Sequence, residues 1–298
     1  MIAALAIAIA LASLVGLPTT ASSQRMTLRD LMALPQPAPD TIIAYGADSL
    51  QFGELFLPRP RGTAVAPVAV LIHGGCWLSG FDRRHLRQLA TTIAGEGIAV
   101  WSIEYRRVGN PGAGWPGTFE DIANGVDHVR RLAGPFRLDT TRAVVAGHSA
   151  GGHFALWAAA RGRLPADAPG AGTPLQLRGA VGIAGVPDLA VVVSGERSLC
   201  GDAIRRLMGG SPSEVPELYR LASPGRLLPL GVEQVVISGA DDAVVPADLS
   251  RRYTTDATAA GDRIRLIVIP DAGHFEVVSA GTPAGAEVIR AIVTLARR

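Results

Sequence analysis

The chain has 298 residues, of which 48% are hydrophobic, and its 28 cationic and 26 acidic side chains leave a net charge of +2. This length and composition suit one large globular domain and exclude an intrinsically disordered chain. Because the charges are nearly balanced, we expect a small-molecule substrate and no nucleic-acid partner. All the cations counted are arginine, since the sequence contains no lysine. This excludes Schiff-base catalysis, serine-lysine dyads and lysine-dependent phosphate loops.

Residues 1–23 have the pattern of a signal peptide. A long apolar run is followed by Pro18 and then by small residues that offer a cleavage site, although the basic residues that normally precede such a run are missing. The run is short for a stable membrane span. We therefore expect a secreted or periplasmic protein with no stable span in its mature form, and keep an uncleaved anchor or a misplaced start codon as alternatives. Residues 24–40 are a polar N-terminal extension.

Residues 41–298 read as one α/β domain, because strand-like and helix-like segments alternate to the end of the chain without an internal repeat. Two leading strands, predicted at residues 42–45 and 51–57, suit an antiparallel edge pair. Later strands are short aliphatic runs, typical of parallel strands covered on both faces. They are predicted at residues 68–72, 98–103, 143–146, 180–183, 235–237 and 264–269. Helices such as 119–132 lie between them, which predicts a mostly parallel central sheet with helices on both faces.

The sequence HGGCW follows the predicted strand 68–72 at residues 73–77. Glycine lets backbone N–H groups approach a substrate oxygen without an intervening side chain, so this loop is a candidate oxyanion hole. The amide of Ala150, which follows a candidate nucleophile, would complete it. The candidate hole residues are Gly74, Gly75, Cys76 and Ala150, with Gly75 and Cys76 favoured within the loop.

The sequence GHSAG at residues 147–151 lies between the predicted strand 143–146 and a helical run at 152–160. This strand-turn-helix context is the one that a nucleophile elbow requires, with glycines that leave room for a strained turn. The amino terminus of a helix also favours developing negative charge. Ser149 is therefore the candidate nucleophile.

Residues 188–230 interrupt the alternation with short polar and proline-bearing pieces. A segment at this place would lie over the carboxyl edge of the sheet, where sites of such folds form. We expect a lid or insertion, and a surface excursion of small helices is the alternative.

A serine hydroxyl needs a neighbouring base, and the sequence has six histidines. His274 follows the predicted strand 264–269, where a loop would place its imidazole above the sheet. The remaining histidines either belong to the elbow or precede it: His73, His85, His128, His148 and His153.

The acid that orients the base should lie between Ser149 and His274 in the chain. Asp241 and Asp242 both follow the predicted strand 235–237. Either carboxylate could orient the base, and the other could cap the turn or the next helix. The family resemblance given below favours Asp242, through its spacing to the following Val-Pro pair.

Several other residues are weaker candidates. The tentative substrate-pocket residues are Trp77, Tyr105, Trp115 and His148. Packing is the alternative for the tryptophans. An ion pair between Arg106 and an acid such as Asp121 is favoured over a substrate contact. Phe275 and Glu276 are expected to position the His274 loop.

Cys76 and Cys200 permit one disulfide, but sequence separation does not reveal whether they pair. Neither cysteine has metal-ligand spacing, so we expect no metal site. The oligomeric state is not indicated by the sequence.

Taken together, HGG-x-W, GHSAGG, the Asp242 loop and GHF resemble the esterase and lipase branch of the α/β-hydrolase superfamily, over residues 42–298. The HGG-x-W form is similar to kynurenine formamidases and to feruloyl-esterase-like carboxylesterases. The hormone-sensitive-lipase group usually has a third glycine where this chain has Cys76.

The resemblance implies a cofactor-free hydrolase that attacks a carbonyl through a Ser149, His274 and Asp242 triad. A carboxylic ester is the favoured substrate. A formamide or other amide is the first alternative, against which the leader argues because kynurenine formamidase is expected in the cytoplasm. A non-catalytic binding protein of hydrolase fold is the second alternative.

Overall fold

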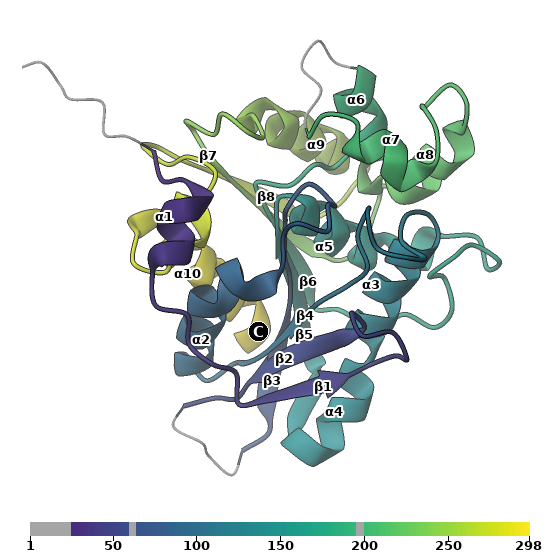
Figure 1. Cartoon of the computed structure of the whole chain (residues 1–298). Coiled ribbons are helices and arrows are strands. Elements are labelled where there is room, and N and C mark those ends of the chain that lie inside the picture. The colour runs from purple at the N-terminus through teal and green to yellow at the C-terminus, as the bar shows by residue number, and fades with distance from the viewer. Residues whose placement is uncertain (1–24, 60–63, 195–199) are drawn as a thin grey trace, which may run out of the picture.

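A computed structural model of the chain describes residues 25–59, 64–194 and 200–298, which fold around an eight-stranded sheet (Figure 1). The strand order is β1-β2-β4-β3-β5-β6-β7-β8. β1 pairs antiparallel with β2, and β2 antiparallel with β4, whereas β3 to β8 form parallel pairs. The mostly parallel sheet and its antiparallel leading pair agree with the predicted fold class.

Every strand predicted from the sequence is present, with ends that differ by a few residues. The strands are β1 (Thr41–Ala44), β2 (Phe52–Phe56), β3 (Ala66–Ile72), β4 (Ala99–Ile103), β5 (Leu138–His148), β6 (Gly179–Ile183), β7 (Glu233–Gly239) and β8 (Ile264–Ile269). The largest difference is at β5, which begins well before the predicted residue 143 because its first residues pair with Ala66 and Pro67 of β3 across a register shift. β5 is therefore a long strand, and its last residue, His148, directly precedes the candidate nucleophile.

The helices connect the strands and cover the sheet. They are α1 (Leu28–Ala33), α2 (Arg87–Gly95), α3 (Gly117–Asp127), α4 (Val129–Phe136), α5 (Ala150–Ala160), α6 (Leu189–Ser194), α7 (Ala203–Met208), α8 (Pro216–Ala222), α9 (Ala247–Ala259) and α10 (Pro283–Arg297). Short 3-10 turns are η1 (Arg83–Leu86), η2 (Arg161–Arg163), η3 (Pro224–Arg226) and η4 (Glu276–Val278).

The helical pattern predicted over residues 119–132 is confirmed, although the segment is divided between α3 and α4. His128 lies at the division, yet its backbone stays right-handed helical at φ −60° and ψ −22°. Its amide still donates to the carbonyl of Asn124 at 2.9 Å. The two helices therefore follow each other without a loop.

Two hydrophobic layers bury the sheet, with α2 and α10 on one face and α3 and α5 on the other (Figure 1). Neighbouring residues of one strand serve opposite layers, because successive side chains of a strand alternate in direction. Val70 of β3 belongs to the same layer as Phe154 of α5, whereas Leu71 belongs to the layer of Ile292 of α10. Coverage on both faces explains why β3 is a continuous apolar run.

The N-terminal extension is partly helical. Thr27 caps α1, because its hydroxyl accepts from the amide of Asp30 while the Asp30 carboxylate accepts from the amide of Thr27. Leu31 of α1 is 1% exposed and joins the same hydrophobic layer as α2. The extension is thus packed against the domain. The predicted signal peptide lies outside the described residues.

Residues 188–230 contain α6, α7, α8 and η3, between β6 and β7. These helices are short, and a lid or insertion at this place stays a prediction. Within the described ranges, no helix is both long enough and apolar enough to cross a membrane.

Candidate active site

Ser149 sits in a strained turn between β5 and α5, with φ 58° and ψ −120°. Such a backbone is costly for a residue that carries a side chain, so neighbouring structure must hold it. Two glycines make the turn possible. A Cβ at Gly147 would lie 2.0 Å from the carbonyl oxygen of Gly151, and one at Gly151 would lie 2.0 Å from the carbonyl oxygen of Ile72. Only glycine fits at either position.

The turn places Ser149 at the carboxyl end of β5 and at the amino terminus of α5. Its amide donates to the carbonyl of Ile183 in β6 at 2.8 Å, which ties the turn to the sheet. Ser149 is 5% exposed. The positive end of the α5 dipole favours negative charge at this point.

His274 and Asp242 come from the loops that follow β8 and β7, and they form a close pair. Nδ1 of His274 lies 2.7 Å from Oδ2 of Asp242. Oδ1 of Asp242 accepts from the amides of Val244 at 2.8 Å and Val245 at 2.7 Å. Both side chains are buried. Asp242 therefore fixes the His274 ring with Nδ1 protonated, which leaves Nε2 free to accept a proton.

Asp241 is directed elsewhere. Its carboxylate forms an ion pair with Arg25 of the N-terminal extension, and the residue is exposed. Of the two adjacent carboxylates, the geometry therefore brings Asp242, and not Asp241, to His274.

A cavity of about 110 Å³ lies beside Ser149 and His274. Ser149 and His274 both line it, while the Ser149 hydroxyl makes no hydrogen bond within the described part of the chain. Such contacts are often long before substrate binds. The cavity is also lined by Leu28, Gly75, Cys76, Phe81, His85, His148, Val244 and Phe275.

The HGGCW loop lies directly against the elbow. A Cβ at Gly74 would lie 2.7 Å from the carbonyl oxygen of His148 and 2.9 Å from Cβ of Ser149. Gly75 and Cys76 line the cavity with positive φ angles of 111° and 53°. Among the described residues, no hydrogen bond is donated by the backbone amides of Gly75, Cys76 or Ala150. These three amides are free to donate to a ligand oxygen.

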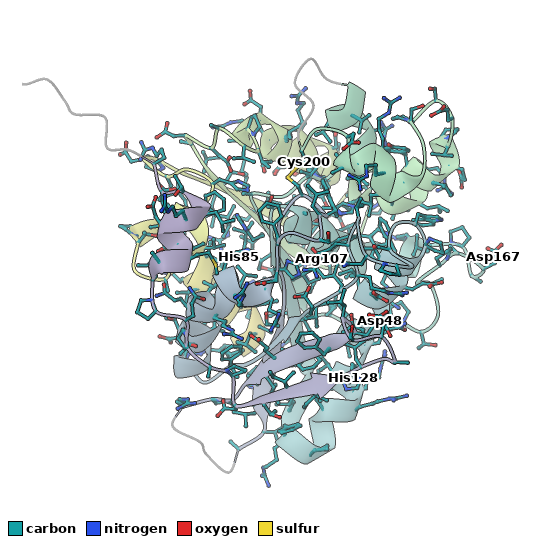
Figure 2. All side chains as sticks on the ribbon, in the orientation of Figure 1. Asp48, His85, Arg107, His128, Asp167 and Cys200 are labelled. Atoms are coloured by element: carbon teal, nitrogen blue, oxygen red, sulfur yellow. A yellow bond between two sulfur atoms is a disulfide. The ribbon has the colours of Figure 1, made fainter. Side chains whose placement is uncertain are left out.

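A network of buried charged side chains holds the HGGCW loop in place. His73 donates to Oε1 of Glu104 at 2.9 Å, and Glu104 also pairs with Arg107 at 2.6 Å. Burial opposes the charge on Glu104, but His73 and Arg107 outweigh that effect and lower its pKa to about 2. Arg107, which is labelled in Figure 2, in turn donates to the carbonyl of Phe81, and Phe81 lines the cavity.

Three of the four predicted pocket residues are not among those that line the cavity beside Ser149. Trp77 and Tyr105 are both 0% exposed. The Trp77 indole packs on His153, while the Tyr105 hydroxyl donates to the carbonyl of His73 at 2.8 Å. Trp115 packs on Phe119 with ring centroids 4.8 Å apart. Trp77 and Tyr105 are therefore packed within the core, and Trp115 is partly buried against α3.

His148, the fourth predicted pocket residue, does line the cavity. Its Nε2 donates to the carbonyl of His274 at 2.9 Å, so the elbow also holds the backbone of the base. Burial and the neighbouring His274 keep the pKa of His148 well below its usual value, so the ring stays neutral.

The structure adds cavity residues that sequence reasoning missed. Leu28 comes from α1, far from the motifs in sequence, and no sequence signal placed it here. His85 lies in η1, where burial lowers its pKa to about 4 and Nδ1 donates to the carbonyl of Asp82 at 2.9 Å. The position of His85 in the sequence, ten residues after Gly75, does not indicate that it lines the cavity.

The other expected contacts near the site are present. Arg106 and Asp121 form an ion pair at 2.6 Å. Glu276 accepts from the amide of Gly273 at 3.1 Å and from the amide of Met26 at 2.7 Å. Glu276 thereby links the His274 loop to the N-terminal extension.

The two cysteines, whose pairing the sequence left open, form a disulfide with a Cα–Cα distance of 5.5 Å. Within the described ranges, no group of three or more histidine, cysteine or acidic side chains is arranged to hold a metal ion.

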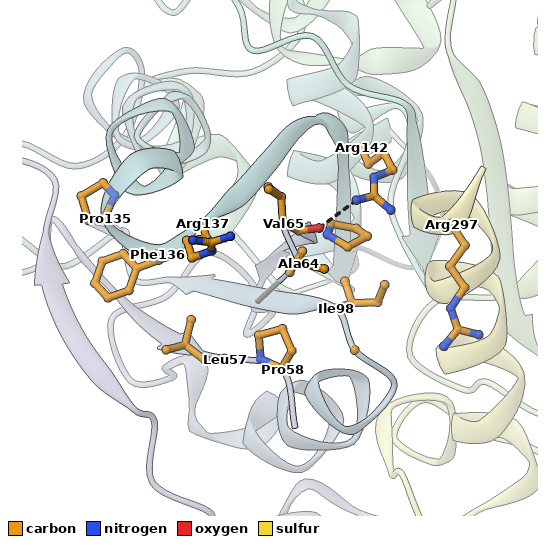
Figure 3. A pocket seen from close by; sticks show the side chains of 13 residues that line it. Leu57, Pro58, Ala64, Val65, Ile98, Pro135, Phe136, Arg137, Arg142 and Arg297 are labelled. Atoms are coloured by element: carbon orange, nitrogen blue, oxygen red, sulfur yellow. Dashed lines mark hydrogen bonds between the residues drawn. The ribbon is translucent and has the colours of Figure 1, made fainter. Parts of the chain in front are cut away.

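A larger cavity of about 660 Å³ lies at the opposite edge of the sheet (Figure 3). It is lined by Ala66, Ile98 and Arg137, near the amino ends of β3, β4 and β5. In open parallel sheets, ligands bind outside the carboxyl ends of the strands. The smaller cavity beside Ser149 is therefore the candidate active site.

Known proteins resemble the chain in sequence and fold. The BD-FAE family profile matches residues 54–256. "Esterase LipC" of Mycobacterium tuberculosis is 28% identical over 244 residues, which cover 80% of this chain and 58% of that protein. The chain thus spans little more than half the length of this curated relative.

Two solved structures have the same fold. "Truncated form of carbohydrate esterase from gut microbiota" aligns with TM-score 0.76 and 21% identity, covering 88% of this chain and 100% of the other. An inhibited Esterase B from "Lactobacillus rhamnosis" aligns with TM-score 0.75 and 20% identity, covering 91% and 92%. The predicted α/β-hydrolase fold and the resemblance to its esterase branch are confirmed.

Proposed function

The chain belongs to the BD-FAE family, and from that premise we propose that it is a serine hydrolase that cleaves carboxylic esters of small or medium-sized substrates. One observation carries the proposal. Ser149, the His274–Asp242 pair and the unpaired amides of the HGGCW loop converge on a single cavity. A nucleophile, an oriented base and an oxyanion site within one cavity are what acyl transfer requires.

The reaction proceeds in two steps through an acyl-enzyme. Nε2 of His274 takes the proton of the Ser149 hydroxyl as Oγ bonds to the ester carbonyl carbon. The carbonyl electrons move to its oxygen, which accepts from the free loop and α5 amides. As the oxygen reforms its double bond, the alcohol leaves with the proton from His274.

Water completes the cycle by the same route. His274 takes a proton from water, whose oxygen bonds to the acyl carbon. The second oxyanion collapses, the Ser149 oxygen leaves and regains its proton, and the carboxylic acid is released. Asp242 stabilises the positive charge that His274 carries in both steps.

The size and lining of the cavity favour a substrate with a short acyl or alcohol group. Its volume is about 110 Å³, and apolar side chains of Leu28, Phe81, Val244 and Phe275 line it. One solved neighbour is described as a carbohydrate esterase. We propose short-chain esters as the first substrates to test.

We also propose that the protein is exported to an oxidising compartment. The support is the apolar leader at residues 1–23 together with the Cys76–Cys200 disulfide, since disulfides persist mainly outside the cytosol. Mass spectrometry of protein secreted by its native host should find a mature N-terminus near residue 24, and an intact leader would contradict export with cleavage.

The test of the activity is the variant Ser149→Ala, assayed with p-nitrophenyl acetate and butyrate. We expect kcat to fall by at least about a thousandfold, since the nucleophile is removed. Ser49→Ala changes an exposed serine that does not line the cavity and serves as the matched control. Persistent hydrolysis by purified Ser149→Ala protein would contradict the proposal. N-formylkynurenine is assayed beside the esters, and a higher kcat/KM for it would replace the ester by a formamide as the preferred substrate.

A further inference from the structure

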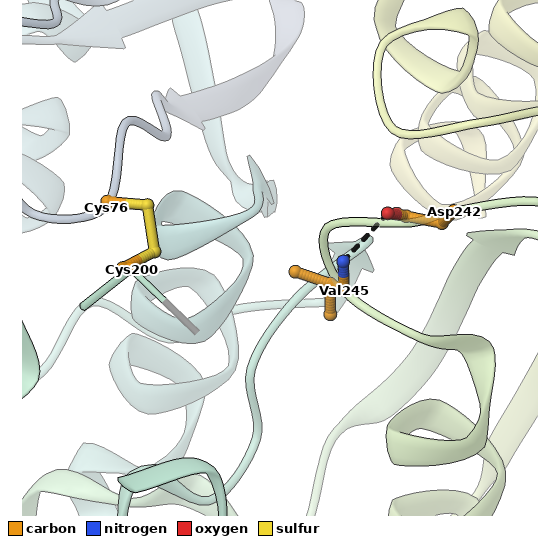
Figure 4. The surroundings of a disulfide bond; sticks show 4 residues. All are labelled: Cys76, Cys200, Asp242 and Val245. Atoms are coloured by element: carbon orange, nitrogen blue, oxygen red, sulfur yellow. Dashed lines mark hydrogen bonds between the residues drawn. A yellow bond between two sulfur atoms is a disulfide. The ribbon is translucent and has the colours of Figure 1, made fainter. Parts of the chain in front are cut away.

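The disulfide between Cys76 and Cys200 joins the cavity to a distant part of the chain. The two cysteines are 124 residues apart, and Cys76 belongs to the HGGCW loop while Cys200 precedes α7 (Figure 4). Figure 2 shows Cys200 on the side of the molecule that carries α6 to α8. A covalent bond therefore connects a cavity-lining residue to the region inserted between β6 and β7.

The backbone at Cys76 needs such support. Cys76 and the next residue, Trp77, have φ angles of 53° and 57°, in the left-handed region that favours glycine. Two consecutive non-glycine residues in this region are strained and persist only when their surroundings hold them.

Hydrogen bonds hold the loop after Cys76, and close packing holds it before Cys76. After it, the carbonyl of Trp77 accepts from Val108 at 2.8 Å, and the amide of Ser79 donates to the carbonyl of Val108 at 3.0 Å. Before it, Gly74 lies against the elbow. The amide of Cys76 itself donates no hydrogen bond among the described residues, so the bond at its side chain fixes this residue.

Cys200 is a firm anchor for that bond. The next helix, α7, begins at Ala203, whose amide donates to the carbonyl of Cys200 at 3.2 Å. Leu207 of α7 is 0% exposed, and its carbonyl accepts from the amide of Trp115 at 2.7 Å. The disulfide thus ties Cys76 to a helix packed into the core.

We propose that Cys200 is a positioning residue for the oxyanion hole. Through the disulfide it holds the amide of Cys76 toward the cavity, so the protein reaches its full rate only when the bond is formed. The inference rests on the proposed function, because an oxyanion matters only if Ser149 attacks a carbonyl.

Three variants test the bridge: Cys200→Ala, Cys76→Ala and the double variant. Cys76→Ala keeps the backbone amide and removes only the sulfur. We expect each single variant to lower kcat about 10- to 100-fold, somewhat less than the loss of a whole oxyanion donor, with KM changed less than about threefold. The double variant should match the single ones, because both remove the same bond.

A trifluoromethyl ketone separates positioning from general destabilisation. It adds to the serine and places an oxyanion in the hole, so its Ki should rise in proportion to the fall in kcat/KM. Assays are made well below the melting temperature of each variant, with folding checked by circular dichroism. A folded Cys200→Ala protein with kcat within twofold of the parent would overturn the proposal, as would a Ki that does not follow the rate.

A phosphine reductant gives the reversible form of the experiment. It breaks the S–S bond to leave two thiols and is itself oxidised to the phosphine oxide, with oxygen from water. The parent rate should fall to that of Cys200→Ala, whose own rate should not change, and reoxidation should restore it. If reduced parent protein keeps its rate, the bridge does not position the hole. If Ser149→Ala remains active, the proposed function fails instead, so the two failures are distinguishable.

Discussion

The loops that end β5, β7 and β8 are held differently from the two segments that border them. Ser149 is tied to the sheet by its amide, and Asp242 accepts two amides of its own loop while it orients His274. The bordering segments are α1, which contributes Leu28, and the region from 188 to 230, which contributes Cys200. Both segments pack on the core, at Leu31 and at Leu207, and they are joined to the cavity loops by an ion pair, a few hydrogen bonds and one disulfide.

This difference indicates that the strand-end loops and the bordering segments have different roles in the reaction. Groups that move protons and bond to substrate need positions fixed within a fraction of an ångström, which strand ends of a buried sheet provide. The bordering segments can vary without disturbing those positions. We therefore expect changes at the strand ends to abolish the reaction, and changes in the bordering segments to alter its rate or selectivity.

The largest contrast is expected between two adjacent carboxylates. Asp242→Asn should lower kcat by about 10⁴-fold, because an amide no longer holds His274 in the required tautomer. Asp241→Asn is the matched control. It removes only an ion pair with Arg25, of a type worth about 0–1 kcal/mol, so kcat should stay within about threefold. Steady-state kinetics on p-nitrophenyl butyrate measures kcat for both variants. Equal losses of kcat would contradict the assignment of Asp242 as the orienting acid.

The second contrast concerns the elbow and an ordinary helix. Gly151→Ala places a Cβ 2.0 Å from the carbonyl oxygen of Ile72, so we expect failure to fold or a loss above about 4 kcal/mol in the free energy of unfolding. Gly95→Ala lies at the end of α2 with no neighbouring atom within 4 Å of the new Cβ, and should change the free energy of unfolding by less than about 1 kcal/mol. Urea unfolding measures both. A stable Gly151→Ala protein would show that the turn is less constrained than its geometry indicates.

Acid should weaken the structure beneath the site. Burial lowers the pKa of His85 and of His153 to about 4, and also lowers that of His148. The unfolded chain takes up protons at these histidines below about pH 6.5, whereas His85 and His153 of the folded chain do not until about pH 4. The free energy of unfolding should therefore decrease as the pH is lowered from about 6.5 to about 4, by about 1.4 kcal/mol per pH unit for each histidine.

His153→Gln tests the source of that dependence. The glutamine amide can still donate to the carbonyl of Ala222, as Nε2 of His153 does at 2.8 Å, but it does not titrate. Urea unfolding from pH 7 to pH 5 should show a shallower slope for the variant. An unfolding free energy that is the same at both pH values in the parent protein would contradict the account.

The smallest effect is expected in α1. Leu28→Ala enlarges the cavity, so the ratio of kcat/KM for hexanoate to that for acetate esters should rise about threefold to tenfold. Met32→Ala, one turn along the same helix, is the control and should leave the ratio unchanged. If Leu28→Ala also leaves it unchanged, the N-terminal extension does not shape the substrate site.

Much of the strand-borne framework could be predicted from the sequence. Continuous apolar runs marked the parallel strands, and each chemical motif followed one of them, so Ser149, Asp242 and His274 were expected at a common edge. The aromatic residues near the motifs were harder to place. Tyr105 follows β4 as a pocket residue would, yet its hydroxyl turns inward to the carbonyl of His73.

The bordering segments could not be predicted, because their contacts depend on tertiary packing. The same two cysteines are compatible with free thiols or a bridge until their Cα distance is known. Leu28 carries no motif and lies far from Ser149 in sequence, and only the docking of α1 brings it to the cavity. Local pattern predicts strands and elbows, whereas long-range contacts of short helices leave no local signal.

Labelling of the native protein with a fluorophosphonate tests the central claim most directly. The proposal predicts one adduct, located on Ser149 by peptide mass spectrometry, with loss of ester hydrolysis in proportion to labelling. Labelling should be at least about a hundredfold slower in Asp242→Asn protein, because the base is no longer oriented. Full inactivation with the adduct on another residue, or no adduct on an active protein, would contradict the account.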